Sequence, residues 1–101
     1  MQAAHMVDFW RMEVAAGRMS VNAARERIQQ YERPAFARAS DWSPELHCAC
    51  DKLENAVGKI AQVVSVDQLD CQLIELRKAR KEFGALVLQL NRQRRMRNGH
   101  G

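Results

Sequence analysis

The sequence has few of the residues that interrupt helices. Its 101 residues include only two prolines and five glycines, the two residue types that most strongly oppose helix formation. Aromatic residues make up 6% of the chain, whereas alanine, leucine, arginine, glutamine and glutamate are frequent, which favours helix over strand. We therefore predict an all-α protein, and a chain of this length is expected to form one domain, residues 1–101.

The sequence also has no apolar run long enough to cross a membrane. A spanning helix needs about 20 consecutive apolar residues, and no stretch approaches that length. The N-terminus does not show a basic region followed by an apolar stretch and a cleavage site. We expect a cytoplasmic protein with no membrane partner. Because His5-Met6 is a dipeptide that cloning often leaves, residues 1–5 are interpreted as a cloning remnant or as disordered.

Signatures of catalysis and of cofactor binding are missing from the sequence. It has no glycine-rich phosphate loop, and its acidic residues are scattered as on solvated helix faces. The three cysteines are an odd number without a CxxC pair, which is typical of reduced thiols. His47, Cys50 and Asp51 have metal-binding side chains within about one turn of a predicted helix, but they are an incomplete ligand set. We predict no enzyme activity, no cofactor and no metal site.

What the sequence does have is a long C-terminal helical pattern. Apolar residues recur at alternating steps of three and four from Val66 to Leu90, with Arg80 standing where an apolar residue is due; this spacing is typical of a helix with one apolar face. Ser65 is the predicted N-cap, and Gln68 is placed to complete a capping box. At ~1.5 Å per residue the helix would be roughly 45 to 50 Å long. Part of it is therefore expected to overhang or to pair with another copy.

Three shorter helices are predicted before it. The first covers Val7–Ala16 and ends at Gly17, and the second covers Val21 to about Glu32. Their turn is one residue longer than that of a helix-turn-helix DNA-binding motif, so a packing hairpin is favoured. The third helix is predicted from Pro44 to about Val64 and should pack antiparallel to the fourth. Two αα-hairpins would then form a small helical bundle of about four helices.

Two expectations concern contacts between these helices. Phe36 and Trp42 are large enough to hold the connector before the third helix against the core. Arg80 is expected to reach solvent or an acid of the third helix, unless Ala79 takes the core position instead. The nearest acids by antiparallel register are Glu45, Asp51 and Glu54.

The C-terminal helix has more apolar surface than one contact face requires. From Phe83 to Leu90 it is apolar on nearly every side, so it must be buried by the N-terminal hairpin or by a second subunit. Gly84 costs roughly 1 kcal/mol relative to alanine in a helix, which close packing of another helix would explain, with a kink as the alternative. The predicted interaction surface consists of Phe83, Leu86, Val87, Leu88 and Leu90.

Basic charge is concentrated near the C-terminus. The net charge of the chain is +4, and because residues 1–64 are balanced, the whole surplus lies in residues 65–101. Residues 91–101 form a basic tail without an acid. Arginines can fork onto phosphates, so nucleic acid is a candidate ligand, although aromatic residues for base stacking are missing there. The alternative is a solvated helix end whose cations suit the helix dipole. The candidate nucleic-acid contacts are Arg92, Arg94, Arg95 and Arg97.

These features lead to two functional hypotheses. The first is a non-catalytic interaction or adaptor protein that forms a homodimer, or binds another helical protein, through its C-terminal helix. The second is an accessory protein that binds nucleic acid through the C-terminal arginines.

Overall fold

A computed structural model describes residues 3–98, with side chains for residues 6–97. The helices are α1 (Ala3–Ala15), α2 (Val21–Glu32), α3 (Pro44–Ile60) and α4 (Val66–Asn98), and a short 3₁₀ helix, η1 (Arg33–Phe36), follows α2. The described residues are 82% helical, with η1 included, and contain no strand. The predicted all-α fold is confirmed. None of the helices in that part combines the length and apolarity needed to span a bilayer.

Local capping explains where three of the helices begin. The hydroxyls of Ser20, Ser43 and Ser65 each accept a hydrogen bond from the amide three residues later, at 3.1, 3.2 and 3.2 Å. These bonds satisfy amides that have no partner inside the helix. Gly17, just after α1, has a φ of 78°, a left-handed conformation that glycine adopts without strain and that ends a helix. The predicted caps and the predicted end of the first helix are confirmed to within one residue.

α1 begins earlier than predicted. It starts at Ala3, whereas the sequence predicted Val7. Residues 3–5, interpreted as a cloning remnant or as disordered, therefore belong to the helix, and the high helix propensity of the alanines at positions 3 and 4 favours this extension. Residues 1 and 2 lie outside the described part.

α3 ends earlier than predicted, at Ile60 instead of Val64. The chain leaves the helix because Val63 turns into the core, where it is 3% exposed, and Arg25 Nη1 of α2 donates to the Val63 carbonyl at 2.6 Å. Gln68 Oε1 accepts from the Val64 amide at 2.8 Å, one residue before the amide of a standard capping box. Side chains of α2 and α4 thus satisfy the polar groups of this connection.

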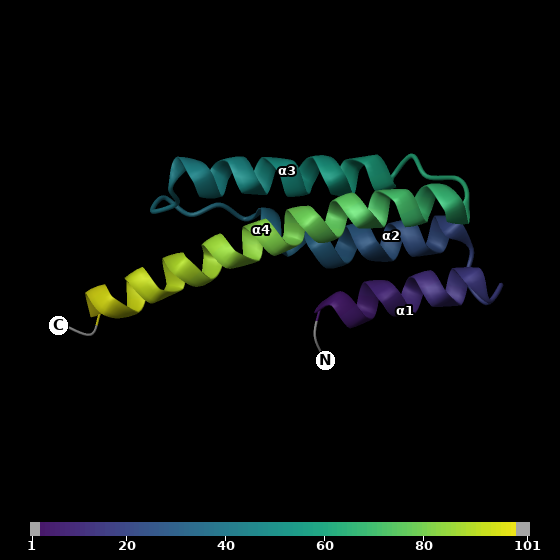
Figure 1. Ribbon diagram of the computed structural model, residues 1–101, viewed down its shortest axis with the longest axis horizontal. Helices are drawn as coiled ribbons and strands as arrows, with labels where there is room; N and C mark the ends of the chain where they lie inside the picture. The colour runs from purple at the N-terminus through teal and green to yellow at the C-terminus, as the bar shows by residue number, and fades with distance from the viewer. Residues whose placement is uncertain (1–2, 99–101) are drawn as a thin grey trace.

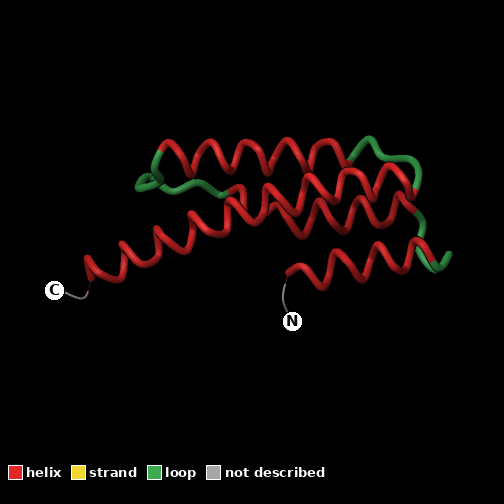
Figure 2. The backbone as a smooth tube through the Cα atoms, viewed as in Figure 1, coloured by secondary structure: helices red, strands yellow, loops and turns green. Residues whose placement is uncertain are grey.

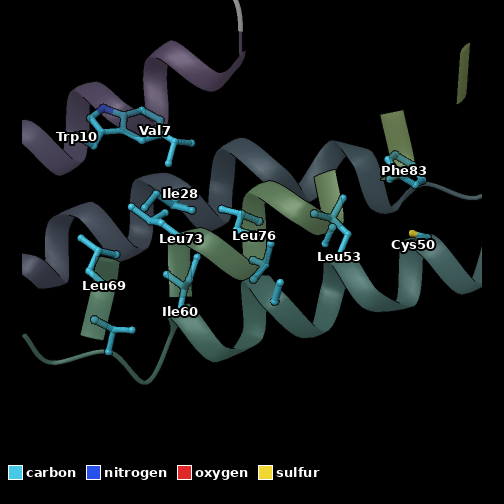
Figure 3. Close-up of a cluster of buried hydrophobic side chains, with 14 of the residues drawn as sticks. Val7, Trp10, Ile28, Cys50, Leu53, Ile60, Leu69, Leu73, Leu76 and Phe83 are labelled. Atoms are coloured by element: carbon cyan, nitrogen blue, oxygen red, sulfur yellow. The ribbon is translucent and has the colours of Figure 1, made fainter. Parts of the chain in front are cut away.

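The four helices pack as two antiparallel hairpins (Figure 1). α3 and α4 make the most extensive contact, α1 lies against α4 and α2, and α2 lies against α3. Side chains from all four helices meet in one apolar core (Figure 3). The core includes Val7 and Trp10 of α1, Ile28 of α2, Leu53 and Ile60 of α3, and Leu69, Leu73 and Leu76 of α4.

The connector before α3 runs between α3 and the C-terminal half of α4, where these two helices diverge (Figure 2). We call residues 37–43 the strap. The indole of Trp42 packs on the ring of Phe83, with centroids 5.7 Å apart, and lies 5.4 Å from the imidazole of His47. Phe36, just before the strap, packs against the core. The predicted anchoring of this connector by its two aromatic residues is confirmed.

Arg80 pairs with an acid, but the acid lies on α2. Its Nη2 forms an ion pair with Oε1 of Glu32, the last residue of that helix, which is 4% exposed. The prediction of an α3 acid is wrong because the Arg80 side chain points to the α2 side, where the Tyr31 ring centroid lies 5.9 Å from its Cζ. Ala79 is buried at 9% exposure and belongs to the apolar core, as the alternative proposed.

The Arg80–Glu32 pair is partly removed from water. Burial lowers the pKa of Arg80, because a charged group loses hydration in the protein interior. The two paired atoms have no other hydrogen-bond partner among the described residues. Each charge therefore depends on the other, and removing one leaves an uncompensated charge.

Replacing Glu32 by glutamine tests this dependence. We expect Glu32→Gln to lower the free energy of unfolding by about 2 to 3 kcal/mol, since Arg80 loses its counter-charge inside the bundle. Urea unfolding followed by circular dichroism measures the change. The control is Glu32→Leu combined with Arg80→Met, which removes both charges and should recover to within about 1 kcal/mol of the parent. Parent-like stability of Glu32→Gln would contradict the role of the pair.

Candidate interaction surfaces

The residues of the predicted interaction surface occupy three environments. Phe83 and Leu90 belong to the core, each 8% exposed. Leu86 and Val87 are half-buried against it, whereas Leu88 is 57% exposed. The strap and its neighbours, and not only the N-terminal hairpin, therefore cover most of the apolar excess within one chain.

Leu88 lies among cations on the outer side of α4. Lys81 precedes it by seven residues, and Arg92 and Arg95 follow by four and seven, spacings that place side chains on one side of a helix. All three cations are exposed. Neither Arg92 nor Arg95 has an acidic partner among the described residues. We call Lys81, Leu88, Arg92 and Arg95 the distal stripe.

The other two C-terminal arginines are engaged within the chain. Arg94 forks onto Asp41 of the strap, with Nε to Oδ2 at 2.8 Å and Nη2 to Oδ1 at 2.7 Å. Arg97 Nη2 reaches the same carboxylate at 3.3 Å. The structure thus separates the four predicted nucleic-acid contacts into two that hold the strap and two that face solvent. The remainder of the basic tail, residues 99–101, lies outside the described part.

The forked contact changes the acidity of Asp41. Hydrogen bonds from Arg94 hold the pKa of the Asp41 carboxyl well below its usual range, because they favour the charged form. The same contact raises the pKa of Arg94. We call Asp41, Arg94 and Arg97 the strap clasp, since it ties residues 37–43 to the C-terminal half of α4.

Two of the three residues considered as metal ligands, His47 and Asp51, contact the guanidinium of Arg38. Arg38 Nη2 donates to Asp51 Oδ1 at 2.6 Å and to Glu54 Oε1 at 2.8 Å, and Nη1 lies 3.1 Å from His47 Nδ1. The hydrogen bonds to Asp51 and Glu54 raise the pKa of Arg38. Among the described residues, no three His, Cys, Asp or Glu side chains converge as a metal site would require. The guanidinium of Arg38 therefore supplies the positive charge that these side chains attract.

Cys50 is enclosed beside that cluster. It is 0% exposed, and its Sγ lies 3.6 Å from Glu54 Oε1. Burial raises the pKa of the Cys50 thiol, which disfavours the thiolate that acts as a nucleophile or metal ligand.

A second exposed apolar group was not predicted from the sequence. Phe9, Met12 and Ile74 are 51, 61 and 51% exposed. Phe9 and Met12 are one turn apart on α1, on the side away from the core, and Met12 shares a shallow groove with Ile74 of α4. We call these three residues the α1–α4 patch. The three-residue spacing of Phe9 and Met12 is the only sequence signal for it, because the neighbourhood of Ile74 depends on how α1 docks.

Two ion pairs line the same groove. Arg11 forks onto Asp70, with Nε to Oδ1 at 2.7 Å and Nη2 to Oδ2 at 3.0 Å, and Arg77 Nη2 pairs with Asp8 Oδ1. Hydrogen bonds from Arg11 lower the pKa of Asp70. The charges beside the α1–α4 patch therefore balance one another.

The strap clasp predicts a specific loss of stability in acid. The pKa of Asp41 is lowered in the folded protein, so its contribution is fully present above the ordinary aspartate value near ~3.9 and is lost as pH falls through the lower folded value. When the pH is lowered from neutral to strong acid, the melting temperature of the parent should therefore fall further than that of Asp41→Asn. Glu26→Gln on α2, an exposed acid without an ion pair in the described chain, is the control and should follow the parent. If the melting temperatures of the parent and of Asp41→Asn fell equally with pH, the proposed contribution of the strap clasp would be contradicted.

No family model, curated protein or solved structure matches this chain.

Proposed function

We propose that this protein is a non-catalytic interaction protein that self-associates, with the α1–α4 patch as the contact between two copies. The observation that carries the proposal is a pair of exposed apolar side chains, Met12 and Ile74, that share one groove, with the exposed Phe9 one helical turn from Met12. Phe9, Met12 and Ile74 each keep more than half of their surface in water. Single exposed apolar residues are ordinary, but grouped ones mark contact sites.

The balanced charges beside the patch favour a contact between identical surfaces. In a two-fold dimer each patch faces its own copy, so an excess of one charge would repel itself. Arg11 is matched by Asp70 and Arg77 by Asp8. Apolar burial, at about 25 cal/mol per Å², then proceeds without opposing repulsion, and the half-exposed ion pairs can remain at the wet edge of the contact.

The distal stripe suits self-association less well than the sequence suggested. In an antiparallel pair of α4 helices crossing at Leu88, Lys81 of one copy faces Arg95 of the other, because both lie seven residues from Leu88. Like charges held opposite each other oppose association. In this proposal, the self-contact predicted for the Phe83–Leu90 stretch therefore moves to the α1–α4 patch.

The surroundings of the reactive side chains support a non-catalytic role. Cys50 is buried with a raised thiol pKa. The neighbouring carboxylates and His47 contact the guanidinium of Arg38. A nucleophile needs access and an adjacent base, and this cluster offers Cys50 no access.

Charge substitutions in the patch test the self-association. We expect light scattering after size exclusion to give twice the chain mass for the parent, and one chain mass for Met12→Glu and Ile74→Glu, because each places repelling carboxylates across the two-fold contact. Leu88→Glu, an equally exposed apolar-to-acid change outside the patch, is the matched control and should keep the parent mass. A monomeric parent, or a dimer lost only in Leu88→Glu, would contradict the proposed contact.

A second candidate function is nucleic-acid binding through the distal stripe. The observation that favours it is the pair of exposed arginines, Arg92 and Arg95, with no acidic partner in the described chain. Arg94 and Arg97 are weaker candidates because a phosphate must first displace Asp41.

Salt-dependent binding to duplex DNA and to RNA tests this candidate. Two phosphate contacts give a log–log salt slope near ~2, below the ~3 to 4 expected for all four arginines. Arg92→Ala with Arg95→Ala should abolish binding measured by fluorescence anisotropy, whereas Arg94→Ala with Arg97→Ala should weaken it little. If neither nucleic acid is bound at low salt, this candidate is excluded.

A further inference from the structure

We infer that the C-terminal half of α4 is a docking site for an acidic amphipathic helix of a partner protein. The docked helix would lie along the same side of α4 as α1, beyond the N-terminal end of α1. This inference concerns the distal stripe and goes beyond the self-association proposed for the α1–α4 patch. It rests on an uncovered helix face, on the composition of that face and on its charge.

The uncovered face continues the one that α1 occupies. α1 runs antiparallel to α4, and its described part begins at Ala3, five residues before Asp8, which pairs with Arg77. It therefore reaches about five residues beyond Arg77 along α4. Gly84 and Asn91 follow Arg77 at steps of seven, so they lie on the same side of α4. Figure 1 shows α4 extending far past the start of α1.

The surface at Gly84 and Leu88 leaves space for another helix. A Cβ added at Gly84 would have no atom within 4 Å, so no described neighbour requires a glycine at this position. Leu88, one turn later, is 57% exposed. Glycine beside a projecting leucine lets a second helix approach the α4 backbone closely while it covers the leucine. Gly58 of α3 is equally open but has no large exposed apolar residue one turn away, and it provides a control.

The charges around Leu88 select the kind of helix that fits. Lys81, Arg92 and Arg95 surround an apolar centre, which is complementary to a leucine face bordered by glutamates, as in helix pairs with opposite flanking charges. A second copy of this chain would instead bring like charges together. A nucleic acid would use the cations but would leave Leu88 without an apolar partner, and the stripe has no aromatic residue for base stacking.

Two synthetic peptides provide the probe. One has about three heptads with leucine at positions a and d and glutamate at e and g, and the other replaces every glutamate by lysine. Fluorescence anisotropy should show the glutamate peptide binding at least about tenfold more tightly than the lysine peptide. Leu88→Glu and Arg92→Glu should each reduce the affinity for the glutamate peptide by about tenfold or more. Arg27→Glu, an exposed charge reversal on α2, is the control and should leave the affinity unchanged.

Paired glycine substitutions separate docking from folding. Gly84→Ala and Gly58→Ala should each raise the melting temperature by roughly 4 to 8 °C, since alanine favours the helix and nothing opposes its side chain. Only Gly84→Ala should lower the affinity of the protein for the glutamate peptide. Ile74→Glu should abolish self-association without changing peptide affinity, so failure of this inference and failure of the proposed dimer are distinguishable.

Three results would overturn the inference. The first is equal affinity for the glutamate and lysine peptides, and the second is parent-like affinity of both Leu88→Glu and Arg92→Glu. The third is binding of a DNA duplex of about 20 base pairs by the distal stripe without binding of the glutamate peptide, which would assign the stripe to nucleic acid.

Discussion

The length of α4 is the constraint on which the rest of the structure depends. α4 has 33 residues and α3, the next longest helix, has 17, so no other helix can cover it from end to end. The three shorter helices bury its first half, and the strap extends the cover by packing Trp42 on Phe83 and by binding Arg94 through Asp41. On the side of its C-terminal half that faces away from the strap, α4 keeps the exposed Leu88 and its neighbouring cations. This uncovered part is thus a direct consequence of α4 being about twice as long as the next longest helix.

The Arg80–Glu32 pair fixes how α2 lies against this long helix. Apolar contacts alone tolerate sliding, because one apolar side chain can replace another of similar size. A partly buried charge pair has far less tolerance, since any shift that separates the two groups leaves each without compensation. Glu32 is the last residue of α2, where the chain turns into η1. The pair therefore aligns the end of α2 with the middle of α4 and sets the starting point of the strap.

The two exposed apolar surfaces differ in how their charges are satisfied. Beside Met12 and Ile74 the acids and bases pair with one another, so the surface is neutral. Around Leu88 the cations remain unpaired within the described chain. A neutral apolar surface is suited to an identical copy and a basic one to an acidic partner. In the proposed assembly, two copies associate through the neutral surface and each keeps its basic surface for an acidic partner.

The sequence by itself determined the helices and most of their ends, and only the tertiary structure decided which distant side chains meet. Serine caps, Gly17 and the three-four spacing of apolar residues act over a few neighbouring positions, so Ser43 and Ser65 could be assigned correctly. The end of α3 was misjudged because Val63 leaves the helix for contacts made by α2 and by the core. The partners Arg80–Glu32, Arg94–Asp41 and Arg38–Asp51 join different elements, and their choice depends on helix register and on the path of the strap. Exposure of Leu88 and burial of Leu90 depend on the same packing, because a local pattern identifies an apolar side chain but not what covers it.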